Sequence, residues 1–124
     1  MSVAILHQGD YLIASIQADL SDTEVVALRD HLAELVGHHR ARGIIVDVAA
    51  LDVIDSFVAR SLRSIAVTAR LRGAETVIVG IQPDVAIAMV QFALNLEPLR
   101  TALDLDEAIV LLDRLTQRDG EDGR

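Results

Sequence analysis

The chain has 124 residues, the size of one domain with a single hydrophobic core, and a formal net charge of -8. Negative charge repels a phosphate backbone and aromatic residues make up only 2% of the chain, which argues against nucleic-acid binding by either charge or base stacking. There is no Cys, and every basic residue is Arg, which excludes thiolate zinc sites, disulfides, P-loop chemistry and Schiff-base chemistry.

The first half of the chain predicts a hairpin followed by a helix and a buried strand. Alternating apolar residues on either side of the turn Gly9-Asp10 are typical of two paired strands. Ser21 and Glu24 form a capping box that starts a helix, and Gly43 is expected to end it. The expected elements are the strands Val3–His7 and Tyr11–Gln17, a helix between Ser21 and Gly43, and the strand Ile44–Val48.

In the second half, helices and strands alternate. Gly73 closes a long helix, and Pro83 stands near the first position of the next one, where its missing N–H does no harm. Asp104 and Glu107 suggest a second capping box. The expected elements are a helix at Asp55–Arg72, a buried strand at Thr76–Val79, a helix at Asp84–Leu96, an extended piece at Thr101–Leu103 and a helix from Asp104 to about Thr116.

This order of elements predicts one α/β domain. Its mixed β-sheet would consist of an N-terminal hairpin and then parallel strands, with about four helices packed on it. Residues 1–118 would form the domain and 119–124 a short, acidic, flexible tail. Loops at the carboxyl ends of strands often carry function in such sheets. We therefore expect a functional site at Ala49–Asp55 and Gly80–Pro83.

Ser56 is the candidate functional residue, at the start of the second helix. At about 100° per residue, the apolar stripe of this helix leaves Ser56, Arg60 and Arg63 on the solvent side and Phe57 half exposed. In one interpretation, Asp55 or Ser56 simply caps the helix. In the other, a phosphate on Ser56 is stabilised by free N–H groups and the helix dipole, and adds roughly -1.5 to -2 charge to a docking surface. The apolar stripe consists of Val58, Leu62, Ile65, Ala66 and Ala69.

Four short motifs follow one another along the chain. They are Asp47-Val48, Val53-Ile54-Asp55-Ser56-Phe57, Gly73-Ala74 and Thr76-Val77-Ile78-Val79-Gly80-Ile81-Gln82-Pro83. Together they resemble the STAS-domain family, and within it the small STAS proteins of the bacterial stressosome. The resemblance runs from about Ile5 to Leu115, and its most specific part is Asp-Ser-Phe combined with Gly-Ile-Gln-Pro at this separation.

The resemblance implies a regulatory protein of the stress response and not an enzyme. Such a protein sequesters a partner serine/threonine protein kinase and releases it when phosphorylated. The resemblance makes Ser56 the phosphoacceptor, and we expect Asp55, Phe57, Arg60 and Arg63 to bind the partner. It also implies association with homologous STAS proteins in a large assembly, and no cofactor or metal.

Two alternatives within the family remain open. A STAS interaction module without phosphorylation, for example the partner of a transporter ATPase, would have a similar composition. Classical anti-sigma-factor antagonists have a small residue and then Gly after the phosphorylated Ser, where this chain has Phe57 and Val58. Because the sequence begins without a signal peptide and has no apolar run of about 18 residues, we expect a cytoplasmic location and no membrane partner.

Two kinds of chemical site are weaker alternatives. A serine hydrolase needs a base beside Ser56, and no Gly-x-Ser-x-Gly elbow is present. Asp47, Asp52 and Asp55 could converge on Mg²⁺, although such carboxylates more often stabilise a loop and a helix N-terminus. The four histidines, none of them expected near Ser56, are His7, His31, His38 and His39. The pair His38-His39 is interpreted as a solvated helix end, where the dipole favours cations.

The third predicted helix is apolar nearly all round. One stripe consists of Val85, Met89, Phe92 and Leu96, and a second of Ile87, Val90 and Leu94. A helix that covers one face of a sheet should be apolar on one side only, and large exposed apolar patches usually mark interfaces. The pattern predicts a self-associating protein, unless neighbouring segments of the same chain hide both stripes.

Overall fold

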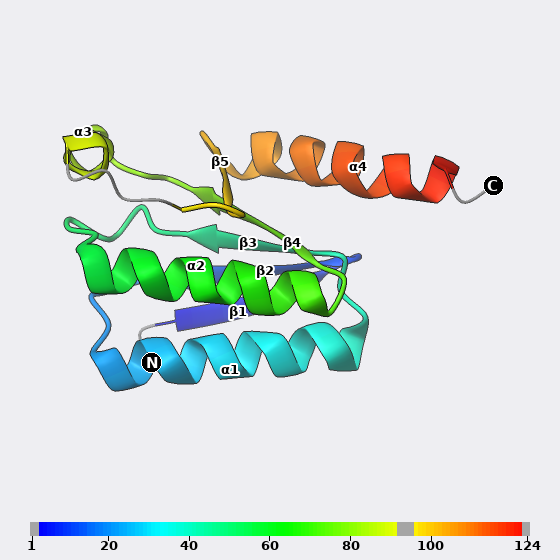
Figure 1. Cartoon of the computed structure of the whole chain (residues 1–124), viewed down its shortest axis with the longest axis horizontal. Helices are drawn as coiled ribbons and strands as arrows, with labels where there is room; N and C mark the ends of the chain where they lie inside the picture. The colour runs from blue at the N-terminus through cyan, green and yellow to red at the C-terminus, as the bar shows by residue number, and fades with distance from the viewer. Residues whose placement is uncertain (1–2, 92–95, 123–124) are drawn as a thin grey trace.

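The computed structural model describes residues 3–91 and 96–122. In that part of the chain one five-stranded sheet has the order β1-β2-β3-β4-β5 (Figure 1). β1 is antiparallel to β2, and all the other neighbours are parallel, which confirms the expected mixed sheet with four helices. The elements are β1 Val3–Gln8, β2 Tyr11–Ile16, α1 Asp22–His39, β3 Gly43–Asp47, α2 Ser56–Leu71, β4 Glu75–Val79, α3 Pro83–Gln91, β5 Arg100–Ala102 and α4 Leu105–Asp122.

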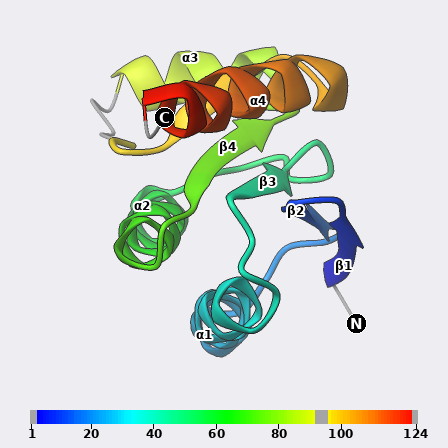
Figure 2. The same ribbon diagram turned by 90° about the vertical axis from the view of Figure 1, so that its right-hand side faces the viewer.

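Helices cover both faces of the sheet. Figure 2 shows α1 and α2 on one side of the strands and α4 on the other. The larger core cluster joins α1 and α2 to the sheet, and a smaller one lies under α4. Because the central strands are covered on both faces, the side chains of Ile44, Ile45 and Val46 in β3 are all fully buried. Among the described helices, none is both long and apolar enough to cross a membrane.

The start of α1 matches the sequence prediction, but its end does not. The capping box of Ser21 and Glu24 is present with both of its hydrogen bonds. The helix ends earlier than expected, at His39, where Arg40 takes the left-handed conformation with φ 52°. Gly43 is instead the first residue of β3. A Cβ at Gly43 would lie 2.9 Å from the Leu112 side chain, so glycine serves the packing of α4 there and does not end the helix.

Later boundaries also differ from the prediction. α3 is described as far as Gln91, and Leu96 lies outside any helix, so the predicted helical end at Leu96 is wrong. The predicted stripe residues Phe92 and Leu94 lie outside the described residues. β5 begins one residue earlier than expected, at Arg100, and α4 continues beyond Thr116 to Asp122, into the segment predicted as a tail.

Candidate functional site

The loop after β3 is held in place by its own backbone and by buried side chains. The Asp47 carboxylate accepts a hydrogen bond from the Ala49 N–H at 2.9 Å, and the Leu51 N–H donates to the Val48 carbonyl at 2.9 Å. Leu51 and Ile54 are buried in the larger core cluster. The loop therefore delivers the chain to the start of α2 in a fixed position.

The loop after β4 lies beside it, as the parallel strand order predicts. The Gln82 side-chain amide donates to the Ala49 carbonyl at 2.7 Å. Gly80 has φ 81°, and a Cβ there would lie 2.9 Å from both the Asp47 carboxylate and the Ala49 side chain. Only glycine combines this backbone conformation with so close an approach of the two loops. The Gly-Ile-Gln-Pro motif thus supports the loop that leads to Ser56.

Asp55, and not Ser56, caps α2. The Asp55 carboxylate accepts a hydrogen bond from the Val58 N–H at 2.8 Å, and Asp55 has extended backbone angles. Ser56 is the first helical residue and is exposed. No hydrogen bond of its hydroxyl is found within the described residues. The capping role that the sequence left open between the two belongs to Asp55, and the Ser56 hydroxyl is accessible to another molecule.

The side chains around Ser56 follow the helical pattern with one correction. Phe57 is half-buried, as expected, but Val58 is also only half-buried. Ala59, which the predicted stripe omitted, is buried in its place beside the confirmed core residues. The core face of α2 is turned slightly because it packs on both α1 and β4. The buried residues of α2 are Ala59, Leu62, Ile65, Ala66 and Ala69.

The two arginines below Ser56 differ in their contacts. Both Arg60 and Arg63 are exposed, as expected. The Arg63 Nε donates to the Glu97 carbonyl at 2.7 Å, which ties α2 to the segment before β5. No hydrogen bond or ion pair of Arg60 is found in the described part of the chain. Arg60 therefore presents a cation to solvent one turn after Ser56, whereas Arg63 has a contact within the fold.

A small apolar groove with acidic residues at its rim adjoins the start of α2. It has a volume of about 250 Å³ and lies between the segment that precedes α1 and the loop that precedes α2. Its lining residues are Asp19, Leu20, Leu51, Val53, Asp55 and Val58. Val53 is 67% exposed although it is a large aliphatic residue. Asp19 and Leu20 were not predicted to reach this site, since they lie in the connection between β2 and α1 and not in the loop before α2.

The chemical alternatives find little support at this site. Asp47 and Asp55 each accept a backbone N–H, and no cluster of three or more potential metal ligands occurs in the described ranges. The rings of His7 and His39 lie 4.2 Å apart between their centroids. This pair sits where β1 and α1 end, at the amino edge of the parallel strands, whereas Ser56 follows their carboxyl edge. The described residues therefore place neither His7 nor His39 next to Ser56.

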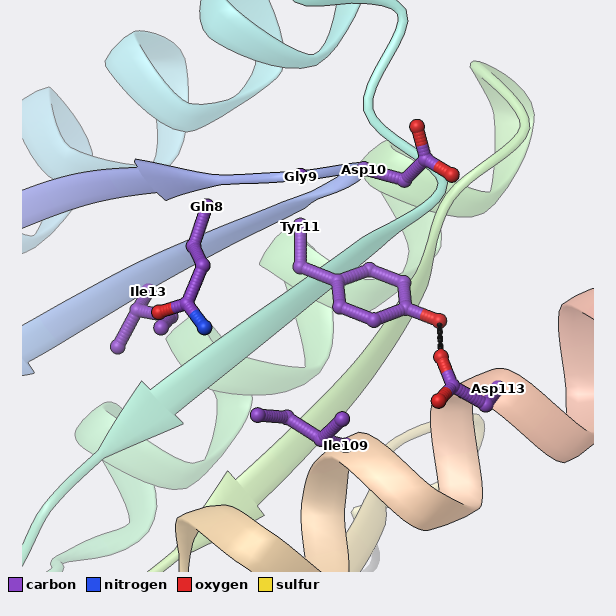
Figure 3. A pocket seen from close by; sticks show the side chains of 7 residues that line it. All are labelled: Gln8, Gly9, Asp10, Tyr11, Ile13, Ile109 and Asp113. Atoms are coloured by element: carbon purple, nitrogen blue, oxygen red, sulfur yellow. Dashed lines mark hydrogen bonds between the residues drawn. The ribbon is translucent and has the colours of Figure 1, made fainter.

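A second polar site lies at the amino edge, between the hairpin and α4. Figure 3 shows the Tyr11 hydroxyl directed at the Asp113 carboxylate, to which it donates a hydrogen bond. Burial raises the pKa of Tyr11, and the hydrogen bond to Asp113 raises it further. Arg42 donates to the Thr116 carbonyl at 2.8 Å in the same region. These bonds fasten α4 to the sheet, across a sequence separation that no local pattern in the sequence reveals.

Comparisons with known proteins find the same fold in a protein family and in solved structures. A family model described as the STAS domain matches residues 2–108. The RsbT co-antagonist protein RsbRA of Bacillus subtilis is 28% identical over 98 residues, which is 78% of this chain but only 36% of that protein. The chain thus spans little more than a third of this relative.

Two solved structures are similar over nearly their whole length. A serine-to-glutamate variant of RsbS from Moorella thermoacetica is 32% identical, with a TM-score of 0.78, over 94% of this chain and 99% of that one. A chain from the structure of the stressosome, described as a signal integration and transduction hub, is 32% identical with a TM-score of 0.71. That similarity covers 91% of this chain and 98% of the other.

Proposed function

This chain belongs to the STAS-domain family, and from that premise we propose that it is a stress-response regulator of stressosome type. It binds a serine/threonine protein kinase and releases it when the kinase phosphorylates Ser56. The observation that carries the proposal is that the cap of α2 and the exposed hydroxyl at its start belong to two different residues. Asp55 provides the cap, which leaves the Ser56 hydroxyl exposed and without a role in holding the fold.

The surroundings of Ser56 suit a docking surface for an apolar partner segment. Phe57 is half-buried, and Val53 is exposed and lines the groove at the start of α2. We propose that the kinase covers these side chains together with Asp55 and Arg60. Arg63 supports this surface through its contact with the Glu97 carbonyl and adds its charge at the edge.

Phosphorylation would weaken this contact for two physical reasons. A phosphate adds roughly -1.5 to -2 charge, which must lose its water when an apolar surface covers it. The added charge also lies on the residue next to Asp55, whose carboxylate lines the groove together with Asp19. The helix dipole stabilises the phosphate in the released state, when it is hydrated. The free energy therefore favours release after phosphorylation.

The relatives support the proposal in general terms. One is described as a co-antagonist, one is a serine-to-glutamate variant of RsbS, and one belongs to the stressosome. By analogy we propose that this chain has no catalytic activity of its own and associates with other STAS proteins. Phe57 and Val58, in place of a small residue and Gly, favour this role over that of a classical anti-sigma-factor antagonist.

The proposal is tested by purifying the tagged chain from its native host and identifying its partners and its phosphorylated residues by mass spectrometry. We expect a protein serine/threonine kinase among the partners and phosphate on Ser56. The purified kinase should then transfer phosphate to the wild-type chain and to Ser64→Ala, but not to Ser56→Ala. Recovery of a transporter ATPase without any phosphate would support the module without phosphorylation instead.

A further inference from the structure

The carboxyl ends of α1 and α2 form a basic surface on an acidic chain. Both helices run towards the amino edge of the parallel strands and pack side by side on one face of the sheet, so their last turns face the viewer in Figure 2. Arg40 follows α1, and α2 ends with Arg70 and Arg72. From Ser56 to Ala74 the chain has four arginines and no acidic residue. Positive charge is therefore concentrated at this end, although the net charge of the chain is -8.

Gly37 lets the two helix ends approach each other. Glycine is an unfavourable residue inside a helix, yet Gly37 lies in the last turn of α1. A Cβ at this position would lie 2.7 Å from the Nη1 atom of Arg72, so the Arg72 guanidinium lies against α1 where no side chain is in its way. Arg40 follows three residues after Gly37, at the same end of the helix. The two helices thus present their terminal arginines on one surface.

Two of these cations have no partner within the fold. The Arg70 Nε lies 3.6 Å from the Glu75 carboxylate. Arg40 and Arg72 are exposed, and no hydrogen bond or ion pair of either side chain is found among the described residues. Cations at a helix carboxyl end stabilise the helix dipole, but the dipole gives no role to Leu71, which lies between two arginines and is 85% exposed. A surface that joins an apolar side chain to unpaired arginines has the composition of a protein-binding site, in which Arg is enriched.

We propose that this surface, which we call the basic end and define by Arg40, Arg70, Leu71 and Arg72, binds an acidic segment of a partner protein other than the kinase. Carboxylates of the segment pair with the guanidinium groups of Arg40 and Arg72, each of which can donate two parallel hydrogen bonds, and an apolar side chain covers Leu71. Ser56 lies at the opposite end of α2, about 24 Å away at 1.5 Å per residue. A segment bound at the basic end therefore leaves the proposed kinase surface free.

A short acidic segment fits the basic end better than a nucleic acid or a membrane does. Duplex DNA carries a charge about every 1.7 Å along its axis, and an anionic membrane extends its charge over a plane. Both would bring negative charge close to the acidic remainder of the chain, including the exposed Glu34 on α1 and Asp10 in the hairpin turn. A segment with a few carboxylates brings its charge to the arginines alone. Its apolar residue also gives Leu71 a partner, which a phosphate backbone lacks.

Selection of phage-displayed peptides on the purified full chain tests the proposal. We expect the selected peptides to carry acidic residues on both sides of an apolar one, and fluorescence anisotropy then measures the affinity of a selected peptide for each variant. Arg72→Ser and Leu71→Ser should each weaken binding at least about fivefold. Arg40→Asn should do the same, and Asn tolerates the left-handed backbone of this position. Arg100→Ser is the matched control, because Arg100 is an exposed arginine on β5 and its loss changes the net charge equally. It should leave the affinity unchanged.

Four results would overturn the proposal. The first is selection of peptides without acidic residues, and the second is an equal loss of affinity in Arg100→Ser and Arg72→Ser, which would indicate net charge alone. The third is a lower melting temperature of Arg72→Ser with unchanged peptide binding, which would leave the arginine only its role at the helix dipole. The fourth is tighter binding of a poly(dT) oligonucleotide or of phosphatidylglycerol vesicles than of the selected peptide, lost in Arg72→Ser, which would assign the surface to a nucleic acid or a membrane.

Kinase affinity separates this inference from the proposed function. Leu71→Ser should bind the kinase as the wild type does, because Leu71 lies at the far end of α2 from Ser56. Loss of kinase affinity in Leu71→Ser would place the basic end within the kinase site and contradict a separate partner. Failure of the kinase to bind the wild-type chain would contradict the proposed function and leave the peptide measurements unaffected.

Discussion

The Asp55 carboxylate accepts the Val58 N–H at 2.8 Å, and this bond holds the first turn of α2 without help from the Ser56 hydroxyl. Ser56 can therefore change its chemistry while the helix keeps its start. A serine that served as the cap would lose that bond on phosphorylation, and the helix end would be disturbed. The proposed phosphorylation site, Ser56, and the capping residue, Asp55, are therefore two different, adjacent residues.

Replacing Asp55 separates capping from charge. Asp55→Ala should lower the free energy of unfolding by about 1 kcal/mol, since alanine cannot accept the Val58 N–H. Asp55→Asn should retain most of the stability because an amide oxygen still caps the helix. Urea denaturation of the wild type and the two variants measures these free energies of unfolding. Equal stability of Asp55→Ala and wild type would show that the cap contributes nothing.

Phe57 and Arg60 should affect kinase binding and not stability. Phe57→Ala removes apolar area from the proposed docking surface, and Arg60→Ala removes an exposed cation that has no described partner. We expect each change to weaken kinase affinity by about tenfold, with the larger effect at Phe57. Arg70→Ala is the control, since Arg70 lies on the same helix but contacts Glu75 at 3.6 Å. Isothermal titration calorimetry with the kinase measures the affinity of each variant. An unaltered affinity of both Phe57→Ala and Arg60→Ala would remove this surface from the docking model.

Gly80 should be less replaceable than Gly73. Both have positive φ, 81° and 91°, so alanine is strained at either position by about 1 kcal/mol. At Gly80 the added Cβ would also meet the Asp47 carboxylate and the Ala49 side chain at 2.9 Å, whereas at Gly73 nothing lies within 4 Å. Gly80→Ala should therefore lower the melting temperature more than Gly73→Ala does. Similar melting temperatures for the two would argue against close contact of the two loops.

Several of these features could be predicted from the sequence because they are local. The capping box of Ser21 and Glu24 involves residues three apart, and the hairpin is set by the turn at Gly9. The half-buried Phe57 follows from the helical period alone. The end of α1 could not be predicted in this way. Gly43 looks like a helix terminator, but its actual neighbours, Leu112 and Tyr11, are known only once α4 has packed on the sheet.

The parts of the site that the sequence did not reveal all depend on tertiary contacts. Arg63 was expected to face solvent, and its bond to the Glu97 carbonyl spans 34 residues. Asp19 and Leu20 approach Asp55 because β2 and β3 are adjacent and parallel, so their following loops meet. The exposure of Ile87 and Val90, in contrast, follows from the width of the apolar pattern, because one helix cannot bury both stripes.

Tyr11 provides a probe of α4 docking that is free of interference, because it is the only Tyr and the chain has no Trp. Burial and the Asp113 carboxylate raise the pKa of Tyr11 above its ordinary value of 10.0. The folded state thus prefers the protonated phenol. Its contribution to stability is full below pH 10.0 and is lost as the pH rises through the higher pKa of the folded chain.

Ultraviolet absorbance of the phenolate checks this directly. The titration of the folded chain should have its midpoint above that of the chain in concentrated urea, and Asp113→Asn should move the midpoint down towards the unfolded value. Tyr11→Phe should lose less stability than the wild type between neutral pH and alkaline pH. A folded midpoint equal to the unfolded one would contradict the packing of Tyr11 against α4.

The central claim is that phosphate on Ser56 releases the kinase, and the most direct measurement compares kinase affinity before and after phosphorylation. The chain is phosphorylated to completion, its single site is confirmed by mass spectrometry, and both forms are titrated into the kinase without ATP. We predict at least about a tenfold weaker affinity for the phosphorylated form, with Ser56→Asp shifted in the same direction and Ser56→Ala bound whatever the ATP level. Equal affinity of the phosphorylated and unphosphorylated chains would contradict the account.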